Sequence, residues 1–352
     1  MFQHTIAPLL GAILLVSGAE SQKPPGGKPQ SVPPLELERT IPIRNIDGRL
    51  GAPVADIERR RIIVPAPVAG SVEVIDLNTG RAVKSIKGLQ RPQSVAWHPE
   101  AARLYVTTRQ DAGLSIYDAQ YNLIRKVSLS ASPDEVQVLP HSKRVIVALG
   151  NSIAIFDLEG QAVGSIRLEG PPSSFVVAPD GQRLWANLQT NKSVVIADLV
   201  SRVPVRSFAA NAEMFAVSGE GRPANYSLST GTNYGLALDV RGRRLMMITR
   251  KPSKLVVMDS ESGNIRDARQ TIADPENVWF DAASRHILIT GNDSTIDVVR
   301  QVDPDHYEPV AHVPSAPGAR TSLLLAESGK FYVAAPADGA RPAGILVYSL
   351  SR

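Results

Sequence analysis

Five charged residues that lie far apart along the chain have side chains suited to holding a polar ligand: Arg109, Asp134, Arg250, Glu276 and Arg320. An arginine guanidinium donates planar, bidentate hydrogen bonds to a carboxylate or phosphate, and a carboxylate accepts hydrogen bonds from donors on a ligand. These residues form a ligand-binding site if the fold brings their loops together, and otherwise they solvate a loop surface. The elements that carry them decide between the two.

A second set of acidic residues recurs along the chain and could be mistaken for catalytic carboxylates. Each of these aspartates ends a β-rich segment and opens a turn that contains Asn, Gly or Ser: Asp76, Asp118, Asp157, Asp198 and Asp259. An aspartate at such a position accepts hydrogen bonds from backbone amides further along the turn. We therefore interpret the five as turn caps.

The histidines argue against acid–base catalysis. Beyond the N-terminal segment the chain has His98, His141, His286, His306 and His312. We expect His98, His141 and His306 in solvated turns, His286 at the start of a second strand and His312 on an outer strand. None of them lies in the loops that carry the five charged residues, so a histidine general base or metal cluster is not predicted there.

Cysteine is absent, which excludes a disulfide, a thiol nucleophile and a cysteine metal site. Asp134 and Glu276 each follow a proline and are the best candidates for calcium ligands, but they are too few to hold an ion. We predict no catalytic residues, no cofactor and no metal.

The elements follow from a repeated unit, seen most clearly at residues 71–80 (SVEVIDLNTG). It alternates like a strand, turns at Asp76 to Gly80 and continues into a second β-rich segment. The positions equivalent to Asp76 are Asp118, Asp157, Asp198, Asp259, Arg300 and Ser349, at successive steps of 42, 39, 41, 61, 41 and 49 residues. A period near 40 with strand patterns predicts an all-β, seven-bladed propeller of four-stranded blades.

The ring must close, because an open edge strand invites pairing with other chains. Residues 36–46 resemble the outer-strand segments, and the last repeat ends just after its third strand. We predict that this N-terminal segment supplies the fourth strand of the seventh blade, with Pro42 at an outer edge where a missing donor is tolerated.

Several stretches resemble the YVTN-type, YncE-like family of seven-bladed β-propellers. They are residues 103–107 (RLYVT), 115–118 (SIYD), 182–185 (QRLW) and 256–263 (VVMDSESG). Residues 250–252, 303–307 and 318–322 are similar to an uncharacterised exported bacterial subgroup. The resemblance covers residues 36–352 and implies a fold rather than a function, because its motifs are strand and turn residues.

The propeller fold implies that the loops between second and third strands share one face with the links between blades, around the central channel. All five charged residues are assigned to that face. The 61-residue step contains an insertion at residues 209–232, with Met214, Phe215 and Tyr226. It is interpreted as a lid or recognition loop over the same face, or as a disordered insertion.

The N-terminus has the pattern of an export signal. Residues 6–16 are apolar but too short to span about 30 Å of hydrocarbon, and Ser17-Gly18-Ala19 suits cleavage after Ala19, although residues 1–5 contain no Lys or Arg. We expect a signal peptide at 1–19, a Pro/Gly-rich linker at 20–35 and the propeller at 36–352, in a periplasmic or secreted protein.

Two main functional hypotheses stay open. The favoured one is a non-enzymatic, monomeric propeller that binds a protein or small polar ligand on its loop face. The alternative is a lactonase-like hydrolase, in which Glu276, Asp134, Arg109 and Arg320 would act on a sugar lactone. Single-stranded nucleic acid is a minor alternative, because the net charge is only +4 and aromatic residues make up 5% of the chain.

Overall fold

The computed structural model describes residues 1, 33–139, 142–188, 192–209 and 233–351. The chain divides into two compact units, Met1–Val32 and Pro33–Arg352. The expected signal peptide, most of the linker, His141 and nearly all of the insertion at 209–232 lie outside the described residues. No helix in the described ranges has the length and apolar character needed to cross a membrane.

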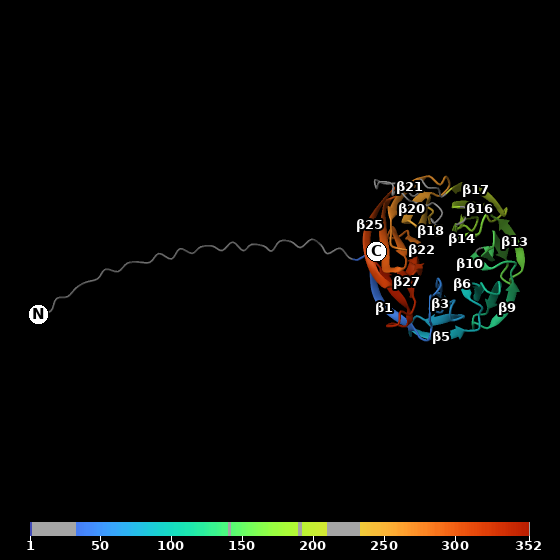
Figure 1. Cartoon of the computed structure of the whole chain (residues 1–352), viewed down its shortest axis with the longest axis horizontal. Coiled ribbons are helices and arrows are strands. Elements are labelled where there is room, and N and C mark those ends of the chain that lie inside the picture. The colour runs from blue at the N-terminus through green and yellow to red at the C-terminus, as the bar shows by residue number, and fades with distance from the viewer. Residues whose placement is uncertain (2–32, 140–141, 189–191, 210–232, 352) are drawn as a thin grey trace. The chain divides into compact units, whose positions relative to one another are not determined.

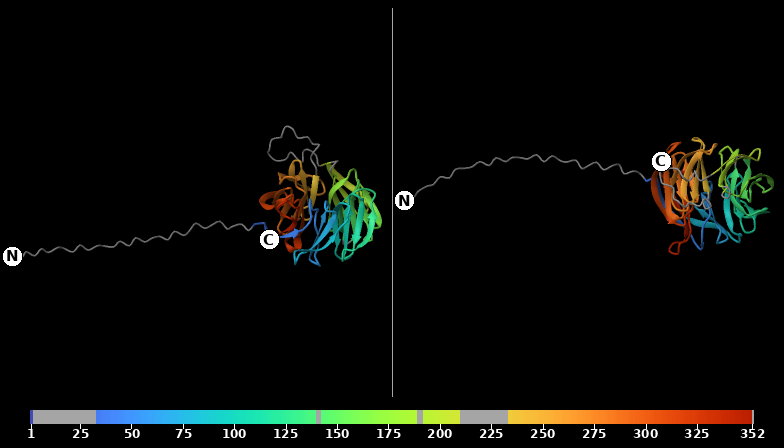
Figure 2. Two further views of the ribbon diagram at one scale, coloured as in Figure 1. Left: turned by 60° about the horizontal axis from the view of Figure 1, so that its bottom comes forward. Right: turned by 45° about the horizontal axis from the view of Figure 1, so that its top comes forward.

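The described part of the second unit forms seven antiparallel sheets of four strands, arranged in a ring (Figure 1). The predicted fold class is therefore confirmed. Figure 2 shows the ring tilted, with the strands running between its two faces. In blades 1 to 6 the strands follow one another in sequence from the central channel outward.

The strand bounds match the repeat. Blades 1 to 3 contain β2 (Val54–Asp56), β3 (Arg61–Ala66), β4 (Ser71–Asp76) and β5 (Arg81–Ile86); β6 (Pro92–His98), β7 (Arg103–Thr108), β8 (Gly113–Tyr117) and β9 (Leu123–Ser128); and β10 (Pro133–Leu139), β11 (Arg144–Leu149), β12 (Ser152–Phe156) and β13 (Ala162–Arg167). Blades 4 to 6 contain β14 (Pro172–Val177), β15 (Arg183–Leu188), β16 (Ser193–Asp198) and β17 (Val203–Ala209); β18 (Asn233–Asp239), β19 (Arg244–Arg250), β20 (Ser253–Asp259) and β21 (Ile265–Gln270); and β22 (Asn277–Asp281), β23 (His286–Thr290), β24 (Asp293–Asp303) and β25 (His306–Pro317). Blade 7 contains β26 (Thr321–Leu325), β27 (Lys330–Ala335), β28 (Ala343–Leu350) and β1 (Leu35–Ile43), with a short 3-10 helix, η4 (Ala326–Ser328).

The core lies between neighbouring blades. The middle strands are covered on both faces, so β7 and β11 are buried at every position after the first and their burial does not alternate. Leu104 on β7 packs with Ile63 of blade 1, whereas the next residue, Tyr105, packs with Val145 of blade 3. Successive side chains of one strand therefore serve two different interfaces, and each blade is held by both neighbours.

The recurring aspartates are turn caps, as predicted. Asp76 accepts hydrogen bonds from the amides of Asn78 and Thr79 at 3.0 and 2.8 Å. Asp118, Asp157, Asp198 and Asp259 accept equivalent bonds from amides two to four residues further on. The hydrogen bond from Thr79 is the largest influence that lowers the pKa of Asp76 below its ordinary value.

Ring closure by the N-terminal segment is also confirmed. Strand β1, blue in Figure 1, pairs antiparallel with β28 from Leu35 opposite Leu350 to Ile43 opposite Ala343. The observed strand ends three residues before the predicted 36–46 segment does. Gly344 is required at this seam, because a Cβ there would lie 2.7 Å from the carbonyl oxygen of Ile41.

One prediction about the histidines is wrong. His98 is fully buried at the end of β6 and is not a solvated turn residue. Its Nδ1 accepts a hydrogen bond from the amide of Ala101, and burial lowers its pKa. His306 and His312 are exposed, as expected, with side-chain exposures of 76% and 67%.

Candidate functional site

The repeat register places the five charged residues at the same face of the ring. Arg109 follows β7 and Arg250 ends β19, both at the exit of a second strand. Asp134 lies at the start of the inner strand β10, and Glu276 and Arg320 immediately precede the inner strands β22 and β26. The residues come from blades 2, 3, 5, 6 and 7.

Three of the five meet directly between blades 5, 6 and 7. Arg250 pairs through Nη2 with Glu276 Oε2 at 2.9 Å and through Nε with Asp274 Oδ1 at 2.9 Å. Arg320 pairs through Nη2 with the other oxygen of Asp274 at 2.7 Å and lies 3.9 Å from Glu276 Oε2. The ring of Tyr234 lies 3.3 Å from the Arg250 guanidinium carbon, which adds a cation–π contact.

The other two residues pair across blades 2 and 3. Arg109 Nη2 lies 3.4 Å from Asp134 Oδ2, and Gln93 Nε2 donates to Asp134 Oδ1 at 3.0 Å. Gln93 is on the inner strand β6, in the position of blade 2 that Asp134 occupies in blade 3.

Arg49, which precedes β2, joins the two groups. It donates to the side-chain oxygen of Gln93 at 3.2 Å and lies 3.6 Å from Glu276 Oε1. Gln93 belongs to blade 2 and Glu276 to blade 6, which are not neighbours in the ring. The contacts therefore run across the central opening. We call Arg49, Gln93, Arg109, Asp134, Arg250, Asp274, Glu276 and Arg320 the channel-mouth network.

The network carries charge of both signs in a partly desolvated setting. Its four arginines and three carboxylates are between 16% and 44% exposed at their side chains, from Arg250 to Arg49. Burial raises the pKa of Asp134 above its ordinary value, and the nearby charge of Arg109 opposes that shift. The exposed pairs contribute at most about 1 kcal/mol each, so the network positions charges more than it stabilises the ring.

Glu135, the next residue along β10, has a different environment. Its carboxylate accepts hydrogen bonds from Gln137 Nε2 at 2.7 Å and from the amide of Phe175 in blade 4 at 3.3 Å. Burial raises its pKa to about 7. The side chain thus contacts blade 4, whereas Asp134 contacts blade 2.

The network has the chemistry of a polar recognition surface. Its carboxylates are paired with arginines rather than poised beside a nucleophile, and the described residues contain no group of three or more metal-ligating side chains. Sequence reasoning missed Arg49 and Tyr234. Tyr234 occupies the same inner-strand position as Gln93 and Asp134, so the repeat register could have identified it.

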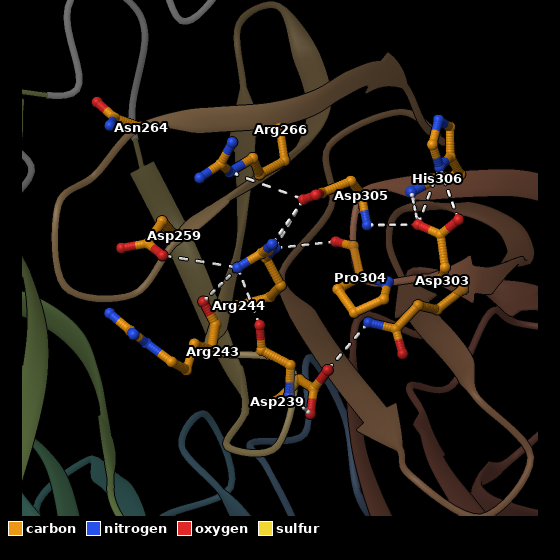
Figure 3. A network of polar contacts seen from close by, with 12 residues as sticks. Asp239, Arg243, Arg244, Asp259, Asn264, Arg266, Asp303, Pro304, Asp305 and His306 are labelled. Carbon is orange, nitrogen blue, oxygen red and sulfur yellow. Dashed lines mark hydrogen bonds and ion pairs between the residues drawn. The ribbon is translucent and has the colours of Figure 1, made fainter.

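A second polar network lies on the opposite face, between blades 5 and 6 (Figure 3). Arg244 donates from Nε to the carbonyl of Pro304 at 2.9 Å and from Nη2 to Asp305 at 2.6 Å, and it lies 3.6 Å from Asp259. Its side chain is 9% exposed. This network joins the β24–β25 turn to blade 5, and its saturated contacts make it a structural clamp.

Comparison with known proteins supports the fold. No protein-family model matches the chain, and no curated protein matches it in sequence. Among solved structures, it is similar to Kuenenia stuttgartiensis hydrazine synthase (TM-score 0.68, 15% identity, covering 86% of this chain and 97% of that one). It is also similar to a chain of the mitotic checkpoint complex (0.73, 12%, 97% and 99%) and to the β-propeller domain of Myceliophteria thermophila Cps50 (Swd1) (0.66, 15%, 90% and 100%).

These likenesses, at such low identity, show the fold alone. The chain is a seven-bladed β-propeller.

Proposed function

We propose that this protein is a non-enzymatic β-propeller whose loop face binds a charged protein partner at the channel mouth. The observation that carries the proposal is the channel-mouth network, in which charges from five blades and the segment before β2 meet across the central opening. A shared opening is where residues so far apart in sequence can act on one partner.

The charge pattern defines the chemistry of that partner. Four guanidiniums and three carboxylates, all partly exposed, offer donors and acceptors in alternation. A surface carrying both signs of charge can exchange these internal pairs for pairs across an interface, and arginine does so with bidentate geometry. We infer a peptide or protein segment with acidic and basic residues close together.

A protein partner is favoured over a small ligand because β-propellers are commonly interaction scaffolds. One similar structure is a chain of the mitotic checkpoint complex, a multiprotein assembly by its name. We further infer, from the repeat motifs and the N-terminal segment, that the chain belongs with the exported YVTN-type propellers and works outside the cytoplasm.

The test starts from mixed-charge peptides selected by display against the full-length protein. Selected peptides are titrated against the wild type, Arg109→Ala, Arg320→Ala and Arg183→Ala. Arg183 pairs with Glu261 at 3.0 Å on the opposite face and is a matched control. We expect the two loop-face variants to weaken binding by about 1.5–3 kcal/mol, with the melting temperature and the control unchanged.

Equal affinity in all four proteins, or a selection that yields no binder, would contradict the proposal.

Glu135 is the observation that favours the hydrolase alternative, because an acid with a pKa of about 7 suits general acid–base catalysis. Its hydrogen bonds lead toward blade 4, however, and not to the arginines of the network. Hydrolysis of a sugar lactone by the wild type, lost in Glu135→Gln, would establish an enzyme instead.

A further inference from the structure

A pocket of about 400 Å³ lies on the loop face beside the channel-mouth network, between blades 1 and 2. Four chain segments meet around it: the stretch before β2, the β3–β4 loop, the β5–β6 link and the β7–β8 loop. The lining residues are Arg49, Pro67, Val68, Gly70, Leu89, Gln90, Arg91 and Gln110. Of the residues of the channel-mouth network, Arg49 alone lines this pocket.

Backbone hydrogen bonds hold the walls of the pocket in place. The amide of Leu89 donates to the carbonyl of Gly70 at 2.9 Å, and the amide of Gln110 donates to the carbonyl of Gln90 at 3.2 Å. Gly70 has φ +63°, and a Cβ at that position would lie 2.9 Å from the Leu89 carbonyl oxygen. The β3–β4 loop is thus closely fitted to the β5–β6 link, and the pocket is a formed feature of the fold.

The polar lining of the pocket consists of donors with positive charge and of amides. Arg49 and Arg91 supply two guanidiniums, and Gln90 and Gln110 supply two side-chain amides. The lining residues include no carboxylate, and within the described part of the chain Arg91 takes part in no ion pair. Two uncompensated or loosely paired guanidiniums on one pocket create a local positive potential that favours an anion.

The rest of the lining is apolar. Pro67 is buried, Leu89 is half-buried, and Val68 is 69% exposed. A pocket of this size with apolar walls and a few convergent polar groups is typical of small-molecule sites. The arginines would bind the charged end of a ligand, while Pro67, Val68 and Leu89 would cover an apolar part.

We propose that this pocket binds a small organic anion, with a carboxylate or phosphate group held by Arg49 and Arg91 and a short apolar chain against Pro67, Val68 and Leu89. The site adjoins the protein-binding surface proposed for the network and shares Arg49 with it. Arg49 lies 3.6 Å from Glu276 and also lines the pocket, so an anion competes with Glu276 for that guanidinium.

The test uses the full-length protein at low ionic strength, with acetate, hexanoate and inorganic phosphate as probes and chemical-shift changes as the readout. We expect Arg91→Gln and Arg49→Gln each to weaken hexanoate binding roughly tenfold or more, because each removes a charged hydrogen-bond donor. Arg81→Gln, at an exposed position on β5, is the matched control and should bind like the wild type. Hexanoate should bind more tightly than acetate, since burial of each methylene is favourable.

Identical titrations in the wild type, Arg91→Gln and Arg81→Gln would overturn the proposal, as would the lack of binding by any of the three probes. Acetate binding as tightly as hexanoate would overturn the proposed contact between an apolar chain and Pro67, Val68 and Leu89. None of these titrations requires a protein partner, so their failure leaves the proposal for the channel-mouth network standing, and the failure of peptide binding leaves this one standing.

Discussion

At the scale of single residues, burial and hydrogen bonding separate acids of the same charge into different roles. The turn aspartates accept hydrogen bonds from backbone amides, which lower their pKa values. Burial instead raises the pKa of Glu135, on the inner strand β10, to about 7. At pH values between 4.5, the ordinary pKa of Glu, and about 7, the folded protein binds more protons at Glu135 than the unfolded chain does. The stabilising effect is therefore complete below about pH 4.5 and is lost as the pH rises through about 7.

Replacing Glu135 with Gln should remove this dependence. We expect the free energy of unfolding of the wild type, relative to the variant, to fall by on the order of 2 kcal/mol between pH 4.5 and 8, measured by urea denaturation across that range. Burial lowers the pKa values of His98 and His286, which act with the opposite sign in an overlapping window, so the difference between the two proteins is the informative quantity. Parallel pH profiles would show that Glu135 is not desolvated in solution.

Residue positions were predictable where the repeat register determines them. Strand period and turn chemistry placed the aspartate caps and put Arg109, Asp134, Arg250, Glu276 and Arg320 on one face. Arg49 was missed because it precedes the first inner strand, outside the repeat unit. The burial of His98 was missed because a turn-like sequence does not reveal that the last residue of β6 is covered in the folded chain.

At the scale of elements, the closing strand shows what the sequence pattern predicts and what it does not. The resemblance of residues 36–46 to outer strands correctly indicated that β1 completes blade 7. The bounds differ because strand pairing ends where β28 begins, at Ala343 opposite Ile43. The need for glycine at position 344 was not visible, since it arises from the close approach of the Ile41 carbonyl in the folded state.

Removing residues 33–46 should leave β28 as an open edge and abolish cooperative unfolding or cause aggregation. Deletion of residues 20–32 is the control, because it spares β1. A synthetic peptide of residues 33–46, added in excess, should restore a single thermal transition in the truncated chain by binding its folded state. A scrambled peptide should not.

Gly344→Val is a milder version of the same test, because its Cβ would force β1 away from β28. We expect a loss of about 1–3 kcal/mol of stability.

For the deletion of residues 33–46, a truncated chain that melts like the full-length protein would show that the ring closes without β1.

At the scale of the whole molecule, the closed ring brings residues from distant parts of the sequence to one central opening. The inner ends of all blades face one opening, so charges from distant segments meet without any local sequence signal. Which of them touch could not be predicted, because the Arg49–Glu276 contact depends on two long side chains, one from the segment before β2 and one from blade 6. The binding partner could not be predicted from the sequence either, because the strand and turn motifs specify the fold and not the ligand.

The position of β1 also bears on export. We propose that residues 1–19 are removed outside the cytoplasm, and cleavage after Ala19 would leave residues 20–34 ahead of β1, which begins at Leu35, so the closing strand is retained. The mature protein should therefore begin near Glu20 and be found in the periplasm or medium, as checked by mass spectrometry of fractionated cells. Leu14→Arg, which breaks the apolar run, should keep the full-length chain in the cytoplasm, whereas Thr5→Arg adds the missing N-terminal charge and should leave export intact. Wild-type protein that retains Met1 in the cytosol would exclude this route, and the partner would then have to be sought inside the cell.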